Sequence, residues 1–400
     1  MLIWAGFSLA VVAMLYLSRK SLSLGMAVGA FLLAAFTLRP VQMLEALRAT
    51  FADPSVLLLA LVVGTIPMIG GVLERSGEMD RLVANMRIGT KPFLAIAPAL
   101  LGLLPMPGGA LLSAPLLERG APQAAGDVKA AANVWFRHTL LIVYPLGSAL
   151  IAAAKIAEVD VYRSIPYLLP GFLLMSLLGY VFLLRGVAGR AENVGPFSLR
   201  GLVVPLVVIL LAPALDIVLK SVFDLPYSEM STAIGVGASL VLAVGIGRVG
   251  PSALLGVFRA MRPWKFSLII IAVFVFLNVF TASGAPESLA ALALPPAVLT
   301  VGVALILGFV TGRIETPASI VIPIYVMSYG SMSIPTFAVT YFAAFLGYLI
   351  TPTHPCISVS LEYFSTSLWA FLRKTALPFA IAVAVISVVG FLVVTGRSAG

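Results

Sequence analysis

Apolar residues occur along the chain in blocks of about 16 to 25, separated by short polar segments that hold most of the lysine and arginine residues. A block of this length crosses the apolar core of a bilayer as one helix. Ten such spans are predicted, at residues 2–17, 22–38, 55–73, 139–154, 164–184, 201–219, 230–247, 266–282, 336–361 and 375–395.

Residues 93–118 and 297–330 do not fit a single crossing. Each segment has two apolar arms of about 10 to 14 residues on either side of a break rich in glycine and proline. At about 1.5 Å per residue, such an arm reaches only about 20 Å into a core of roughly 30 Å. Both segments are therefore predicted to be hairpins that enter and leave the membrane on one side.

The composition agrees with a membrane protein. Hydrophobic residues make up 61% of the chain and charged residues 10%, and the mean hydropathy is +1.10. The net charge of +9 resides in the loops and does not form a basic cluster with interleaved aromatic residues. We therefore expect no nucleic-acid partner, and a lipid bilayer as the environment.

The distribution of positive charge tests the two hairpins, because cytoplasmic loops carry an excess of lysine and arginine. With re-entrant hairpins and the N-terminus outside, roughly three quarters of the 25 lysine and arginine residues lie inside. If the hairpins crossed instead, the charges would divide about evenly. The first block has no preceding positive residue and is followed by "SRK", so it is expected to remain as a span. The prediction is a multi-pass protein of a bacterial or archaeal cytoplasmic membrane, with both termini outside.

Matching residues indicate an internal repeat. Ser76-Gly77 lies 207 positions before Ser283-Gly284, and Pro145 lies 207 positions before Pro352. Each half then contains five spans and one hairpin, and an odd number of spans turns the second half upside down relative to the first. The predicted fold is an all-α polytopic membrane protein of two inverted repeats with broken helices at the midplane. The predicted units are repeat 1 at 1–190 (hairpin 93–118, broken helix 133–154), a cytoplasmic linker at 191–199, and repeat 2 at 200–400 (hairpin 297–330, broken helix 336–361).

Inverted repeats with interrupted membrane segments are typical of secondary transporters, whose binding site lies where the interruptions meet. Four breaks occupy matching places: "PMPGG" at 105–109, "YPLGS" at 144–148, "TGRIETP" at 311–317 and "TPTHP" at 351–355. Irregular backbone in a membrane persists only where protein, ions or water satisfy its polar groups. The candidate substrate- or ion-binding residues are Pro107, Gly108, Gly109, Ser113, Asn133, Tyr144, Gly147, Ser148, Thr311, Arg313, Glu315, Thr316, Thr351, Thr353 and His354.

Two charges in the second hairpin allow two interpretations. Arg313 and Glu315 each cost on the order of 2.5–3.5 kcal/mol at the centre of a membrane helix, so each needs a partner, a wet cavity or a ligand. In one interpretation the two side chains only neutralise each other. In the other, Arg313 attracts an anionic group of the solute while Glu315 binds a coupling proton or cation.

Four further residues near the breaks are interpreted mainly as structural. Arg137 is interpreted as an anchor at the membrane interface and His138 as a satisfied polar residue, while His354 lies in a break where a proton could be sensed. Cys356 is interpreted as a small buried residue. One cysteine and two histidines are taken to exclude a disulfide framework and a Cys/His metal cluster. No metal and no cofactor are expected, apart from H⁺ or Na⁺ as coupling ion.

The motifs resemble a known group of proteins. The layout of two inverted units resembles the ion-transporter superfamily, which includes arsenite permeases, sodium/proton antiporters, gluconate permeases and citrate and dicarboxylate symporters. "LLPMPGGALLSAP", "NVWFRH" and "TPTHPCISVSLEYF" resemble one uncharacterised integral membrane family within it, a domain of unknown function. The resemblance implies a homodimer in which hairpins and broken helices move against a scaffold. Dicarboxylate members carry Ser-Asn-Thr at the hairpin tips, where this chain has Pro107–Gly109 and Arg313–Thr316.

The predicted function is secondary active transport of a small anionic, carboxylate-type solute by an elevator-like motion coupled to H⁺ or Na⁺. A cation/proton antiporter that uses Glu315 is the alternative. A membrane-embedded enzyme is less favoured, because Ser113, His138 and His354 are the only candidates for its chemistry and no aspartate is expected within the membrane. A channel is less favoured because four convergent breaks fit alternating access better than a continuous pore.

Overall fold

The computed structural model describes residues 2–18, 20–103, 109–188, 196–352 and 354–395, and these residues form helices without a β-strand. Seven of the described helical segments are long and apolar enough to cross a membrane. The prediction of an all-α polytopic membrane protein is thereby confirmed. The seven segments are Pro54–Arg75, Val161–Leu184, Leu199–Val222, Ser228–Gly247, Pro263–Ala282, Ile334–Tyr363 and Leu368–Thr395. Of these, Ile334–Tyr363 combines two helices, Ile334–Ile350 and Pro355–Tyr363.

Among the described residues, long and short helices occur in the same order in the two halves of the chain. The first half holds α1 (Leu2–Leu17), α2 (Leu22–Thr37), α3 (Pro40–Phe51), α4 (Pro54–Arg75), α5 (Glu78–Ala84), α6 (Thr90–Gly102), α7 (Gly109–Gly120), α8 (Gly126–Thr139), η1 (Leu140–Ile142), α9 (Ser148–Ile156), α10 (Val161–Gly179) and η2 (Tyr180–Leu184). The second half holds α11 (Leu199–Val222), α12 (Ser228–Gly247), α13 (Pro251–Met261), α14 (Pro263–Ala282), α15 (Ala285–Ala290), η3 (Val298–Val303), α16 (Ala304–Thr311), α17 (Glu315–Tyr329), α18 (Ile334–Ile350), α19 (Pro355–Tyr363) and α20 (Leu368–Thr395).

The breaks predicted at 144–148, 311–317 and 351–355 are confirmed. Helix α9 begins at Ser148 after a non-helical stretch, and α19 begins at Pro355, where proline suits the first helical position. Between α16 and α17, Gly312 has a φ of 63°, a left-handed conformation that ends a helix and that glycine adopts without strain. At the first hairpin, α6 ends at Gly102 and α7 begins at Gly109, while residues 105–108 of the predicted tip lie outside the described part of the chain.

The sequence did not predict the two short helices α3 and α13. Each begins with a proline and is too short for a span, and its exposed face mixes polar and apolar residues. Only Ala46 and Thr50 of α3, and Val257 and Met261 of α13, are buried. A search for long apolar blocks passes over such helices, because their hydrophobic residues lie along one face instead of filling the segment.

The expectation that no aspartate lies within the membrane is wrong. Asp216 lies inside α11 and is 2% exposed. It accepts hydrogen bonds from Tyr162 at 2.6 Å, Ser231 at 2.6 Å and Thr232 at 3.0 Å, and it pairs with Lys220 at 3.1 Å. These partners on α10, α11 and α12 satisfy the buried carboxylate, so its role is to join the three helices.

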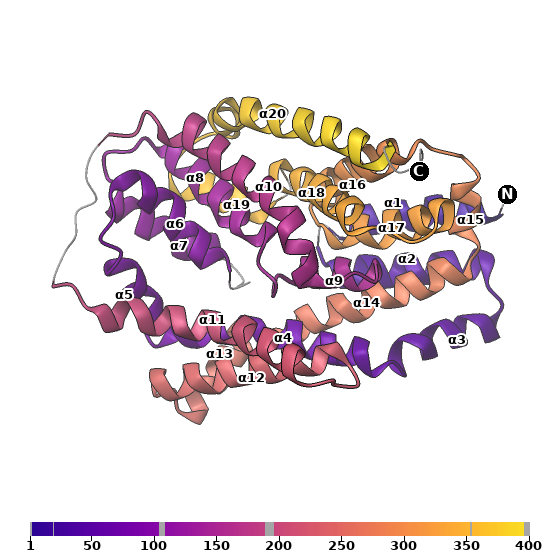
Figure 1. Ribbon diagram of the computed structural model, residues 1–400, viewed down its shortest axis with the longest axis horizontal. Helices are drawn as coiled ribbons and strands as arrows, with labels where there is room; N and C mark the ends of the chain where they lie inside the picture. Colours follow the sequence, from indigo (N-terminus) through magenta and orange to yellow (C-terminus); the bar gives the residue numbers. More distant parts are fainter. Residues whose placement is uncertain (1, 19, 104–108, 189–195, 353, 396–400) are drawn as a thin grey trace.

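The two hairpins lie at opposite ends of the molecule. In Figure 1, α6 and α7 are at the left, whereas α16 and α17 are at the right. Helices α4, α11, α12 and α13 form the lower side of this view, and α8, α18, α19 and α20 the upper side. Helix α4 packs against α12, α13 and α14, and α18 packs against α10, α16 and α20. Helices α8, α18 and α19, which flank two of the breaks, therefore lie on the opposite side of this view from α4, α11 and α12, and the long helix α20 lies with them.

Helices α4 and α14 end in the same way. The cap residue Ser76 is followed by Gly77 with a φ of 73°, and the cap residue Ser283 is followed by Gly284 with a φ of 70°. The repeated Ser-Gly pair of the sequence thus marks the same left-handed helix end in both halves. The two helices also contact each other, because Ser267 on α14 donates a 2.8 Å hydrogen bond to the carbonyl of Ala60 on α4, its counterpart 207 positions earlier.

Close packing of α11 and α12 supplies a test of the fold. A Cβ added at Gly235 would meet the backbone carbonyl of Ala212, whereas a Cβ at Gly237 meets nothing within 4 Å. We expect Gly235→Ala to lower the free energy of unfolding by about 1–3 kcal/mol through overpacking. The matched control Gly237→Ala, on the same helix, should be neutral or stabilising by up to about 1 kcal/mol. Melting temperatures of the two variants in detergent check this, and equal values would contradict the packing.

Candidate functional site

A cavity of about 900 Å³ lies where the broken segments meet. Four helices that restart after a break place their first residues in its wall: α7 at Gly109, α9 at Ser148, α17 at Glu315 and α19 at Pro355. The first turn of a helix leaves backbone N–H groups without partners and carries a partial positive charge. The backbone N–H groups alone therefore favour the binding of an anion in the cavity.

The charged side chains reinforce this preference. Among the described residues that line the cavity, five are cationic and one is acidic. Cations lining a concave, partly apolar wall raise the local concentration of anions. The five cationic residues are Lys20, Arg137, Arg262, Lys265 and Arg313, and the acidic residue is Glu315.

Arg137 is held in place by a buried polar network. Its guanidinium donates to the Ser113 hydroxyl at 3.4 Å, and Ser113 in turn donates to Asn133 at 2.5 Å. The Asn133 amide donates to Ser360 at 3.0 Å, and Ser113 and Asn133 are both fully buried. The network ties α7, α8 and α19 together directly behind the cavity, so it fixes the guanidinium at the cavity wall.

The position of Arg137 differs from the one expected of a residue at the membrane interface. A residue that anchors a helix at the membrane interface keeps its head group in water, but Arg137 is only 5% exposed and lines the cavity. The interpretation as an interface anchor is therefore wrong. Its position four residues after Asn133, on the same helix face, was the available signal that the two side chains belong to one site.

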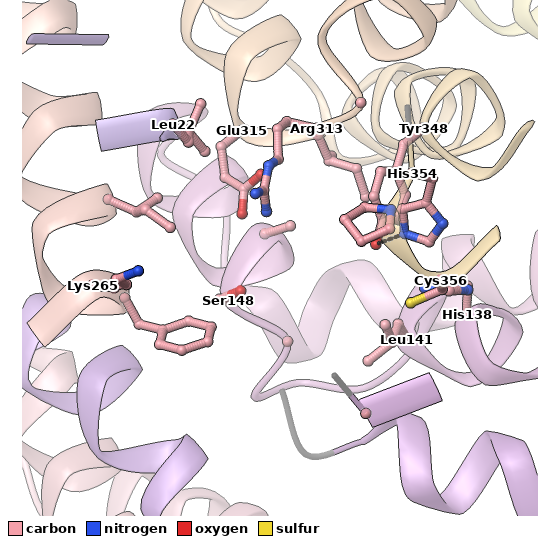
Figure 2. Close-up of a pocket in the computed structure, with 18 of the residues that line it drawn as sticks. Leu22, His138, Leu141, Ser148, Lys265, Arg313, Glu315, Tyr348, His354 and Cys356 are labelled. Atoms are coloured by element: carbon pink, nitrogen blue, oxygen red, sulfur yellow. Dashed lines mark hydrogen bonds between the residues drawn. The ribbon is translucent and has the colours of Figure 1, made fainter. Parts of the chain in front are cut away.

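Arg313 and Glu315 lie side by side at the second break (Figure 2). Glu315 is 7% exposed in the first turn of α17, where the helix dipole stabilises a negative charge. The ion pairs found among the described residues do not include one between Arg313 and Glu315. Both residues line the cavity, where a solute or an ion can reach them.

A second cluster surrounds His354. Its ring lies 4.6 Å from the ring of His138, centre to centre, and its Nε2 is 2.8 Å from the Tyr348 hydroxyl. Figure 2 shows these residues with Cys356 at one end of the cavity, and Arg313 and Glu315 at a different part of its wall. His138 and His354 are each 3% exposed. The cavity thus has a charged part and an imidazole–thiol part.

The predicted site residues fall into four groups. Gly109, Gly147, Ser148, Arg313, Glu315 and His354 line the cavity, whereas Ser113 and Asn133 lie behind Arg137. Tyr144, Thr311, Thr316 and Thr351 are buried near the breaks but do not line it. Pro107, Gly108 and Thr353 lie outside the described residues.

Sequence reasoning missed several lining residues. His138 and Cys356 were assigned passive roles, and Tyr348, Tyr341 and Lys265 were not considered, yet all five line the cavity. The sequence could have identified His138 as a site residue, because it lies beside Arg137 and just before a break. No feature of the sequence marks Lys265 as a site residue, since it reaches the cavity only through the packing of α14 from the other half of the chain.

Gly109 offers a test of the cavity wall. A Cβ at this position would overlap the guanidinium of Arg137. We expect Gly109→Val to displace Arg137 and to weaken anion binding by at least about tenfold, as for loss of one charge-assisted hydrogen bond. Gly256→Val on the exposed helix α13, where a Cβ meets nothing within 4 Å, is the control. Anion-induced shifts in melting temperature measure both, and an unaltered shift for Gly109→Val would remove the α7 terminus from the site.

Comparisons with known proteins concern nearly the whole chain. A family model described as "Protein of unknown function (DUF401)" matches residues 2–394. None of the curated proteins compared with the chain matches it. The solved structure of the Alcanivorax borkumensis YdaH transporter is similar, with a TM-score of 0.61 and 15% sequence identity over 92% of this chain and 96% of that one. At this level of identity the likeness shows a common fold.

Proposed function

This chain belongs to the DUF401 family, and we propose that it is a secondary active transporter of a small, carboxylate-type anion. One observation carries the proposal: four helix N-termini and five cationic side chains converge on a cavity with a single lining carboxylate, counted over the described residues. Such a site compensates a negative charge with both backbone and side chains. The cavity volume of about 900 Å³ suits a small organic solute.

The architecture supports transport over enzymatic or channel activity. The YdaH protein, which has a similar fold, is a transporter by its name. The matching order of helices in the two halves, and the contact between Ala60 and Ser267, agree with two repeats related by a two-fold axis that passes between α4 and α14. We propose that the repeats are 1–190 and 200–400 and are inverted, since the hairpins lie at opposite ends of the molecule. Inverted repeats interconvert readily between two states open to opposite sides.

The proposed motion is elevator-like, with hairpins and broken helices moving against the long helices, in a homodimer. Lys155 on the broken helix α9 pairs with Glu229 on α12 at 2.9 Å and donates to Ser55 on α4 at 2.5 Å. This contact joins a segment of the mobile part to two helices of the proposed scaffold. It would have to break during the motion, so it favours one of the two states.

A cation/proton antiporter remains the second candidate function. Glu315 supports it, because a buried carboxylate that faces a cavity is a typical carrier of protons or sodium inside a membrane. In the preferred proposal the same carboxylate binds the H⁺ or Na⁺ that drives uptake of the anion. The two functions differ in whether an organic anion is needed for ion movement.

A screen for stabilising ligands tests the proposal. Purified protein is heated with carboxylates, sugar acids, amino acids and inorganic oxyanions, each with and without sodium. A solute at about 100 times its Kd should stabilise the protein by about 2.7 kcal/mol. Uptake of the same solute into proteoliposomes, driven by a proton or sodium gradient, completes the test. Ion exchange without any anion would instead support the antiporter.

A further inference from the structure

Three potential metal ligands meet in the cavity, whereas the counts of cysteine and histidine predict no such cluster. One ligand atom from each of His138, His354 and Cys356 lies within 4.8 Å of the other two. His138 comes from α8, while His354 and Cys356 come from the start of α19, more than 200 residues later. Counting one cysteine and two histidines could not reveal this cluster, because only the packing of the two broken helices brings them together.

The hydrogen bonds of both imidazoles leave a nitrogen for a metal. His138 Nδ1 lies 2.6 Å from the carbonyl of Val134, so it donates there and leaves Nε2 as a lone-pair donor. His354 Nε2 is 2.8 Å from the Tyr348 hydroxyl, and its Nδ1 is buried without any hydrogen-bond partner among the described atoms. A metal-ligating histidine usually binds a carbonyl or another oxygen through its second nitrogen in this way.

We propose that His138, His354 and Cys356 form a binding site for a late first-row transition metal ion of the zinc class. Two imidazoles and one thiol suit Zn²⁺ or Co²⁺ and are poor ligands for Mg²⁺ or Ca²⁺, which require oxygen. Ligand atoms of a tetrahedral zinc site lie about 3.4–3.8 Å apart, so the cluster closes by roughly 1 Å through small rotations of the side chains. The fourth position faces the cavity, which all three residues line.

The cysteine binds a metal as its thiolate. Arg137 lines the same cavity as Cys356. Metal binding replaces the thiol proton, which leaves to solvent, and forms one bond from the metal to sulfur and two to nitrogen. The bound dication and one thiolate leave a net positive centre, to which an anion can bind at the open position.

Cobalt is the probe for this site, because a thiolate bound to Co²⁺ gives a charge-transfer band in the near ultraviolet. The protein has a single cysteine, so such a band reports Cys356 alone. The full chain is purified without a polyhistidine tag and titrated with Co²⁺ and then Zn²⁺. We expect a cobalt band at about one ion per chain that zinc abolishes. Cys356→Ser should lack the band, and His138→Gln and His354→Gln should each weaken cobalt binding by at least about 100-fold.

Val359→Ala is the matched control, because Val359 lies on the same helix and lines the cavity without offering a ligand atom. If Cys356→Ser does not fold, alkylation of Cys356 in the wild-type protein must remove the band instead. A missing band, or equal cobalt affinity of the wild type and both histidine variants, would overturn the site. The proposal does not rest on the proposed transport, which is tested separately by anion-induced stabilisation of metal-free protein in a chelator.

Discussion

Arg313→Gln is expected to weaken binding of the transported anion by about 10- to 100-fold, because a hydrogen bond to a charged group contributes about 1.5–3 kcal/mol. The guanidinium lies at the second break and lines the cavity beside the α17 N-terminus. Arg313→Lys should restore only part of the affinity, because an ammonium group lacks the planar pair of donors that matches a carboxylate. Solute-dependent melting temperature and the apparent binding constant for uptake are the measurements.

Two outcomes would contradict this role for Arg313. If Arg313→Lys bound the anion as well as the wild type, the contribution would be one of charge alone. If Arg313→Gln bound it equally well, Arg313 would not be part of the site, and Arg137 would be left as the principal cation. Lys374→Gln on α20, where Lys374 pairs with Asp127 and does not line the cavity, is the matched control for the loss of one positive charge.

Glu315→Gln is expected to abolish the effect of the coupling ion while leaving anion binding measurable. The carboxylate is 7% exposed and lines the same cavity as Arg313. Because glutamine keeps the shape but carries no charge, uptake should lose its dependence on pH or sodium and should no longer concentrate the solute against a gradient. If the protein is an antiporter, the same variant loses ion exchange altogether. Uptake into proteoliposomes with imposed proton or sodium gradients distinguishes the two results.

The double variant Arg313→Gln/Glu315→Gln separates function from simple charge compensation. If the two residues only neutralise each other, the double variant transports nearly as well as the wild type. The proposed roles require it to combine the defects of both single variants. Wild-type rates would therefore remove both residues from the site.

The sequence predicted the helices well because their physical signals are local. Most long apolar blocks correspond to long helices, and glycine and proline mark the interruptions, since they end helices whatever surrounds them. The span predicted at 139–154 is wrong, because α8 ends at Thr139 and the next α-helix begins only at Ser148. Gly312 and Pro355 are found at the helix ends that their chemistry requires. The helices α3 and α13 were missed because their apolar residues form one face and not a block.

The site was predictable only in part, for a reason that is also physical. Residues within a break, such as Arg313 and Glu315, were identified because charge in an apolar segment demands an explanation. Cys356 was not, because a single cysteine has no meaning until packing places it beside His138 and His354. Arg137 was misjudged because its distance from the end of a span does not reveal that α7 and α19 cover it.

The most direct test of an anion site in the cavity uses Cys356, which is the only cysteine in the chain and lines the cavity wall. Metal-free protein in membrane vesicles is treated with a maleimide, and the rate of alkylation is measured with and without an anion that raises the melting temperature. The account predicts at least about tenfold slower alkylation at saturating anion, and at the same concentration a much smaller effect in Arg313→Gln. An anion that stabilises the protein but leaves the alkylation rate of Cys356 unchanged would contradict binding in this cavity.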